Sequence, residues 1–159
     1  MNAARLILAG ALLTSGYALY AKPVARSAAP SAAELVTARQ AGMDMSASAL
    51  TLLKNASTNG VPLKNLAFPA GGLAKWATAL PTLFADSTKG AKSDAKPEVF
   101  TDRAGFGAKA QAYIDATKSL AAAAAADDKP AFDAALASTG AACKGCHDAF
   151  KVPPPAKPG

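Results

Sequence analysis

The sequence predicts an all-α fold built from four helices. Alanine is abundant and aromatic residues make up only 6% of the 159 residues, a composition that favours helices packed through small side chains. Apolar residues recur at separations of three, four or seven, which is the spacing of a single buried helical face. Proline, glycine and aspartate interrupt this pattern between the helices. We therefore expect an antiparallel four-helix bundle with one long connection.

The N-terminal residues 1–21 have the three-part form of a secretory signal peptide. A short positive start at Arg5 precedes an apolar stretch from Leu6, and small residues follow. The apolar stretch is shorter than the ~20 residues that usually span a bilayer, so the segment is either cleaved or kept as a membrane anchor. We expect a linker over residues 22–30, the bundle over 31–151 and a proline-rich tail over 152–159.

Capping and helix-breaking residues predict where each helix begins and ends. Ser31, with Glu34 in the first turn, should cap a helix that runs to about residue 56. After a long connection, a second helix should cover 73–84. A third should begin at Pro97 and continue through the six alanines of 121–126, and a fourth should span 130–151. The buried faces should include most of the aromatic side chains, namely Phe68, Trp76, Phe100, Phe106 and Tyr113.

The charge pattern argues against nucleic-acid binding. The formal net charge is +6, but the positive residues are scattered and no aromatic residues interleave with them. Removal of residues 1–21 takes away only Arg5, so the mature surface stays basic. Such a surface suits a soluble protein that meets acidic protein partners.

The strongest functional signal is the segment Cys143-Lys144-Gly145-Cys146-His147. It uses both cysteines and the only histidine of the chain. This is the C-x-x-C-H pattern in which two thiols add to the vinyl groups of haem and the adjacent imidazole binds the iron. On a helix, positions 143, 146 and 147 share one face. The sequence therefore predicts one covalently bound haem c, attached to the C-terminal helix of the bundle.

Three other uses of these residues are a thiol–disulfide exchange motif, a zinc site and a structural disulfide. A thioredoxin-like motif requires a strand followed by a helix, which this sequence does not predict. A zinc site would lack a fourth cysteine or histidine ligand. These alternatives are therefore weaker than haem attachment.

With the motif in the last helix, the sequence resembles the class II cytochromes c, the family that includes cytochrome c′. Three further segments strengthen the resemblance over residues 31–151: Arg39-Gln40 followed by Met43, Lys96-Pro97-Glu98, and Phe150-Lys151 after the haem histidine. The family usually has arginine at the position of Lys151. Its low-spin members often have tryptophan at the position of Phe100.

The resemblance implies that Met43 faces the open side of the iron. A thioether there can complete a six-coordinate, low-spin iron, so the resemblance points to the methionine-ligated branch. Periodicity alone would also accept Met43 as an ordinary core residue. Met45 should point away from this face. Arg39 lies one turn before Met43, so its guanidinium is expected to bind a haem propionate, with Gln40 assisting.

These features predict a periplasmic cytochrome that transfers one electron and passes it to a redox partner protein. The alternative is a five-coordinate haem protein that binds nitric oxide or carbon monoxide. No acid–base pair and no second histidine are present, so we do not expect an enzyme. The resemblance also implies that a homodimer through the first helix is possible. Membrane association is expected only if residues 1–21 stay uncleaved.

Overall fold

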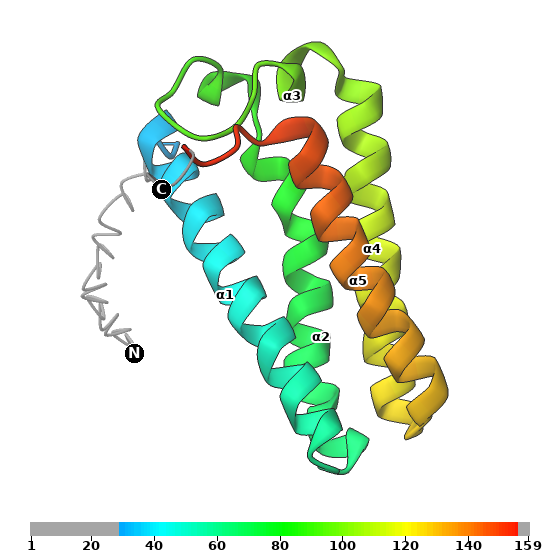
Figure 1. Ribbon diagram of the computed structural model, residues 1–159. Helices are drawn as coiled ribbons and strands as arrows, with labels where there is room; N and C mark the ends of the chain where they lie inside the picture. Colours follow the sequence, from blue (N-terminus) through cyan, green and yellow to red (C-terminus); the bar gives the residue numbers. More distant parts are fainter. Residues whose placement is uncertain (1–28, 156–159) are drawn as a thin grey trace, which may run out of the picture.

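The computed structural model describes residues 29–155, which fold as an antiparallel four-helix bundle (Figure 1). The all-α prediction is thus confirmed. The long helices are α1 (Ala32–Thr58), α2 (Leu63–Ala79), α4 (Arg103–Ala126) and α5 (Lys129–Phe150), and α3 is a single turn (Glu98–Thr101). The predicted signal segment and most of the predicted linker lie outside the described residues. Within residues 29–155, no helix is long and apolar enough to cross a membrane.

The cap of α1 forms as the sequence predicted. The Ser31 hydroxyl accepts a hydrogen bond from the backbone N–H of Glu34 at 3.3 Å, and the Glu34 carboxylate accepts one from the backbone N–H of Ser31 at 2.7 Å. These reciprocal bonds satisfy two donors that a helix start leaves without partners. Hydrogen bonding from Ser31 also lowers the pKa of the Glu34 carboxyl. The first helix therefore has a defined start on which the position of its later residues depends.

Helix α2 begins ten residues earlier than predicted, at Leu63 instead of residue 73, and contains Pro69. A proline inside a helix costs about 3 kcal/mol and each glycine about 1 kcal/mol. Burial of a leucine side chain contributes roughly 1.5–3 kcal/mol, and α2 buries three leucines on one face. The burial of these leucines therefore offsets the destabilising effect of the proline and the glycines on the helix. Phe68 lies on the opposite face and is 91% exposed, so its predicted place in the core is wrong.

The predicted third helix is broken near its start. Asp102 separates α3 from α4, and its carboxylate accepts a hydrogen bond from the backbone N–H of Gly105 at 2.9 Å. Aspartate is a strong N-cap residue because its side chain satisfies an unpaired helix donor. The prediction of one continuous helix from Pro97 overlooked this cap. The break lets α4 take its own direction against α2 and α5.

The long connection crosses the end of the bundle where α1 begins and α5 ends (Figure 1). It contains two short 3-10 turns, Leu80–Leu83 and Asp86–Thr88. Its last residues pair with the chain after α5, because Lys96 N–H donates to Phe150 O and Val152 N–H donates to Asp94 O. The Lys96 ammonium group also donates to the carbonyls of Asp148 and Ala149, where it complements the α5 dipole. The connection is thus tied to the C-terminal end of α5.

Helix α4 is the centre of the packing, with extensive contacts to both α2 and α5. Helix α1 packs on α2 but contacts α5 little. The core buries side chains from α1, α2, α4 and α5, and its largest fully buried members are Leu53, Leu120 and Phe132. Figure 1 shows α1 standing apart from α5 along much of its length. The space between these two helices is where the functional residues gather.

A close approach between α1 and α2 fixes the part of α1 that faces this space. The Trp76 ring of α2 lies directly against Gly42 of α1, and a Cβ atom at Gly42 would overlap the ring. Within the described residues, the Trp76 indole nitrogen is buried without a hydrogen-bond partner. Because Gly42 precedes Met43, this contact also sets the position of Met43.

We predict that Gly42→Ala destabilises the fold by roughly 1–3 kcal/mol, because the added methyl group forces the two helices apart. Gly107→Ala is the matched control. Gly107 is an exposed helical glycine on α4, and a Cβ atom added there would meet only open space, so alanine should be neutral or stabilising by about 1 kcal/mol. Chemical denaturation of both variants measures the difference. Equal stabilities would show that α1 and α2 are not in tight contact at Gly42.

Candidate functional site

The predicted haem-attachment residues lie in the last two turns of α5 and face one cavity. Cys143, Cys146 and His147 all line it. The helix that carries them begins at Asp128, whose carboxylate accepts a hydrogen bond from the backbone N–H of Ala131 at 3.0 Å. Both cysteines are half-buried free thiols. The helical spacing of the motif therefore brings its three reactive groups to one surface, as predicted.

The cavity lies between α1, α4 and α5 and consists of two adjoining hollows. The outer hollow measures about 540 Å³ and the inner one about 310 Å³. The hollows are adjacent, because six residues line both: Met43, Ala47, Phe84, Phe106, Cys146 and His147. Binding sites for organic ligands in proteins measure roughly 300–1000 Å³. The combined space therefore suits a ligand of cofactor size.

The two hollows differ in character. The inner hollow is walled mostly by apolar side chains, among them Leu50, Leu73, Leu80 and Ala110. The outer hollow adds polar and charged side chains at the end of the bundle crossed by the long connection: Arg39, Gln40, Asp44, Ser93, Asp94 and Lys151. A ligand with an apolar body and a polar edge would match this division.

Arg39 is the most unusual charged residue of the cavity, because it is only 3% exposed. Its guanidinium donates hydrogen bonds to Leu83 O at 3.2 Å, Thr88 Oγ1 at 3.0 Å and Ser93 Oγ at 2.9 Å. It also lies over the Phe84 ring, 4.4 Å from the centroid. This position agrees with the expectation that the Arg39 side chain reaches the cavity. Thr88 and the other loop partners were not predicted.

Arg39 carries its charge without a counterion. In the described part of the chain no carboxylate forms a salt bridge with it, and burial lowers the pKa of its guanidinium. A buried charge is unfavourable unless it is paired or hydrogen-bonded, and here only neutral oxygens serve it. An anionic group in the outer hollow would complete the site.

The remaining predicted residues also fall where helical periodicity put them. Met43 is half-buried and lines both hollows, while Gln40 is exposed and lines the outer hollow. Met45 is 72% exposed and does not line the cavity, which agrees with its predicted outward direction. Met43 and His147 therefore belong to the same cavity on different helices, α1 and α5.

The surroundings of the motif favour the neutral forms of its side chains. Burial raises the pKa values of the Cys143 and Cys146 thiols, an effect that Lys109 on α4 partly opposes at Cys146. Burial also lowers the pKa of the His147 imidazole, and Lys151 lowers it further. A neutral imidazole has a free nitrogen lone pair, which is the form that binds a metal ion.

The donor set fits covalent haem better than the alternatives. Within residues 29–155, no group of three or more histidine, cysteine or acidic side chains is arranged to hold a metal ion, which disfavours zinc. The two thiols are not joined, which disfavours a structural disulfide. Two free thiols, an imidazole, an apolar hollow and a buried unpaired cation together match the vinyl groups, iron, ring and propionates of haem.

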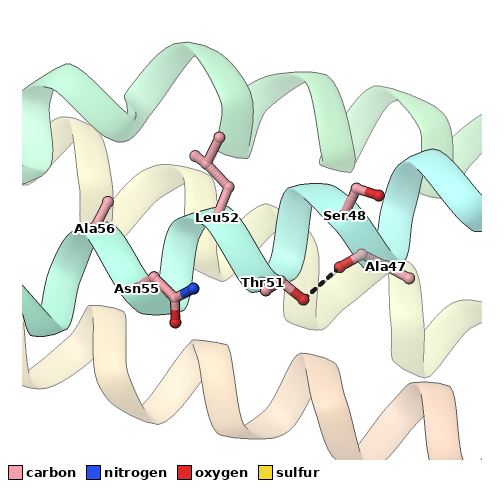
Figure 2. A pocket seen from close by; sticks show the side chains of 6 residues that line it. All are labelled: Ala47, Ser48, Thr51, Leu52, Asn55 and Ala56. Atoms are coloured by element: carbon pink, nitrogen blue, oxygen red, sulfur yellow. Dashed lines mark hydrogen bonds between the residues drawn. The ribbon is translucent and has the colours of Figure 1, made fainter.

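A third hollow is a shallow depression on the surface of α1 (Figure 2). All six residues that line it belong to this one helix, and Thr51 among them donates its hydroxyl hydrogen to Ala47 O. Ala47 and Thr51 also line the inner hollow. The depression therefore borders the cavity from the α1 side.

Comparisons with known proteins agree with this geometry. A family model described as "Cytochrome C'" matches residues 34–151. A cytochrome c′ of Rubrivivax gelatinosus is 46% identical over 71 residues, covering 44% of this chain and 55% of that protein. The aligned segment thus spans only about half of the relative's length.

Solved structures cover more of the fold. A ferrous variant of cytochrome c prime from Alcaligenes xylosoxidans with bound NO has a TM-score of 0.72 and 30% identity, covering 79% of this chain and 99% of that one. A cytochrome c′ described as having ligand-controlled dimer dissociation has a TM-score of 0.73 and 27% identity, covering 79% and 100%. Because the family model spans most of the bundle and the site retains its haem-attachment motif, this chain belongs to the cytochrome c′ family.

Proposed function

We propose that this chain is a haem protein that binds nitric oxide or carbon monoxide at its iron. The observation that carries the proposal is that the side chains beside Met43 in the inner hollow are largely apolar, so a small molecule held next to the haem ring would meet few polar groups. Such space accepts a small neutral molecule and disfavours ions. The Alcaligenes xylosoxidans relative with bound NO supports the same function.

The chain, as a member of this family, carries covalently attached haem c. We assign Cys143 and Cys146 as the two sulfur attachment points and His147 as the axial ligand of the iron. When bound, the haem would supply an iron that can bind a small ligand and can change its charge by one electron. Helix α5 holds the three attaching groups in fixed register on one face.

Arg39 binds a haem propionate in this proposal, and the exposed Gln40 assists. The support is the buried guanidinium that lines the outer hollow without a carboxylate partner. A propionate would form charge-assisted hydrogen bonds, which are roughly twice as strong as neutral ones. The aromatic rings of Phe84 and Phe106, 4.9 Å apart between centroids, form part of the wall that excludes water.

Electron transfer remains the second candidate, and Met43 is the observation that favours it. Its thioether lines the same hollows as His147, so it is placed to act as a sixth ligand. Low-spin iron with two protein ligands suits one-electron transfer because little rearrangement accompanies the change. The expected methionine-ligated branch has no support from the relatives, which carry the name cytochrome c′.

The proposed compartment is the periplasm, because covalent haem attachment and a signal-like N-terminus both indicate export.

Two other expectations stand as proposals. The chain is not an enzyme, since no acid–base pair is apparent in its sequence. It can form homodimers through α1, which exposes Met45 and Leu52; sedimentation equilibrium of the holoprotein tests this directly. An acidic redox partner belongs to the second candidate function.

We predict that replacing both motif cysteines with alanine abolishes covalent haem attachment. The protein should be produced in a host that matures c-type cytochromes and then denatured before electrophoresis. The unmodified protein should stain for haem and the double variant should not. Haem staining that persists in the denatured double variant would show that other residues attach the cofactor.

A second experiment separates the two candidate functions. The reduced holoprotein should bind carbon monoxide, and the optical spectrum should shift. Met43→Ala should keep the spin state and speed association by roughly tenfold, equivalent to about 1.4 kcal/mol, because it clears the hollow. Met45→Ala, on the exposed face of the same helix, should change neither.

The opposite pattern would support the electron carrier. In that case the unmodified protein would be low-spin and insensitive to carbon monoxide, and only Met43→Ala would become high-spin and bind the gas. Stopped-flow mixing with optical detection measures both quantities on the same samples.

A further inference from the structure

The inner hollow contains four side chains with hydroxyl groups, and they are not equivalent. Ser46 and Thr51 come from α1, Tyr113 from α4 and Thr139 from α5. Each hydroxyl has one hydrogen to donate and lone pairs to accept with. A hydroxyl can therefore donate to a ligand only if its hydrogen is not already bonded to another acceptor.

Three of the four hydrogens are already committed to the backbone of the same helix. Ser46 donates to Gly42 O at 2.7 Å, and Thr51 donates to Ala47 O at 2.9 Å. Thr139 donates to Ala135 O at 2.8 Å. These hydroxyls can then only accept hydrogen bonds inside the hollow.

Tyr113 is the exception. It is 6% exposed, lines the inner hollow and makes no hydrogen bond to a backbone carbonyl through its side chain. The remaining donors that line the inner hollow belong to Cys143, Cys146 and His147, which are assigned to the haem.

We propose that Tyr113 is the hydrogen-bond donor to a small molecule held beside the haem ring in the inner hollow. The inference rests on the proposed gas-binding function and names the residue that would select among gases. A neutral donor in an apolar hollow stabilises partial negative charge on the outer atom of a bound diatomic molecule. Burial raises the pKa of the Tyr113 hydroxyl, so the group keeps its hydrogen at neutral and mildly alkaline pH.

The test is the carbon monoxide stretching frequency of the reduced holoprotein, measured by infrared spectroscopy. A donor that bonds to the outer atom lowers this frequency. Tyr113→Phe should therefore raise it and speed carbon monoxide dissociation by roughly five- to tenfold, the effect of about one hydrogen bond.

Thr117→Val is the matched control. Thr117 is a fully buried hydroxyl residue one turn after Tyr113 on α4, and its hydroxyl donates to the Tyr113 and Ile114 carbonyls and does not line the cavity. This variant should leave the frequency unchanged.

The outcomes separate the inference from the function on which it rests. An unmodified protein that binds carbon monoxide with the same frequency as Tyr113→Phe would overturn the role of Tyr113 and leave gas binding intact. An unmodified protein that forms no carbon monoxide adduct would overturn both.

Discussion

The separation of α1 from α5 is the constraint on which the site depends. The α4 helix packs tightly on α2 and α5, whereas α1 is held mainly by α2. Trp76 fills the contact at Gly42 and so fixes the position of α1 relative to α2. The cavity opens between α1 and α5, with Met43 on one wall and the Cys143–His147 motif on the other. If α1 collapsed onto α5, no room would remain for a cofactor.

Charge at the outer end of the cavity complements this arrangement. Arg39 connects three segments, since α1 carries it while its hydrogen-bond acceptors come from the end of the Leu80–Leu83 turn and from the loop that follows. That loop in turn pairs with the last residue of α5, because Lys96 N–H donates to Phe150 O. A propionate at Arg39 would thus join the cofactor to the same network. We therefore expect cofactor binding to stabilise this end of the bundle, and the ordered end of the bundle to stabilise the bound cofactor.

Local sequence signals predicted the chemical groups of the site more accurately than they predicted where the helices begin and end. The Cys143, Cys146 and His147 spacing placed three reactive groups on one helix face, and Ser31 with Glu34 marked the start of α1. The start of α2 was mispredicted because Pro69 is a strong local breaker, while the leucine burial that overrides it depends on α4. The burial of Arg39 could not be inferred either, since its partners lie 44–54 residues away along the chain.

The spin state of the iron tests the central claim most directly: that the iron would keep one ligand position open for a gas. Electron paramagnetic resonance of the oxidised holoprotein measures the spin state without any added gas. We expect a high-spin ferric signal, because the proposed gas binding requires that Met43 line the cavity without binding the iron. A purely low-spin signal would contradict the open position, since it would require Met43 or another side chain to occupy the sixth coordination site.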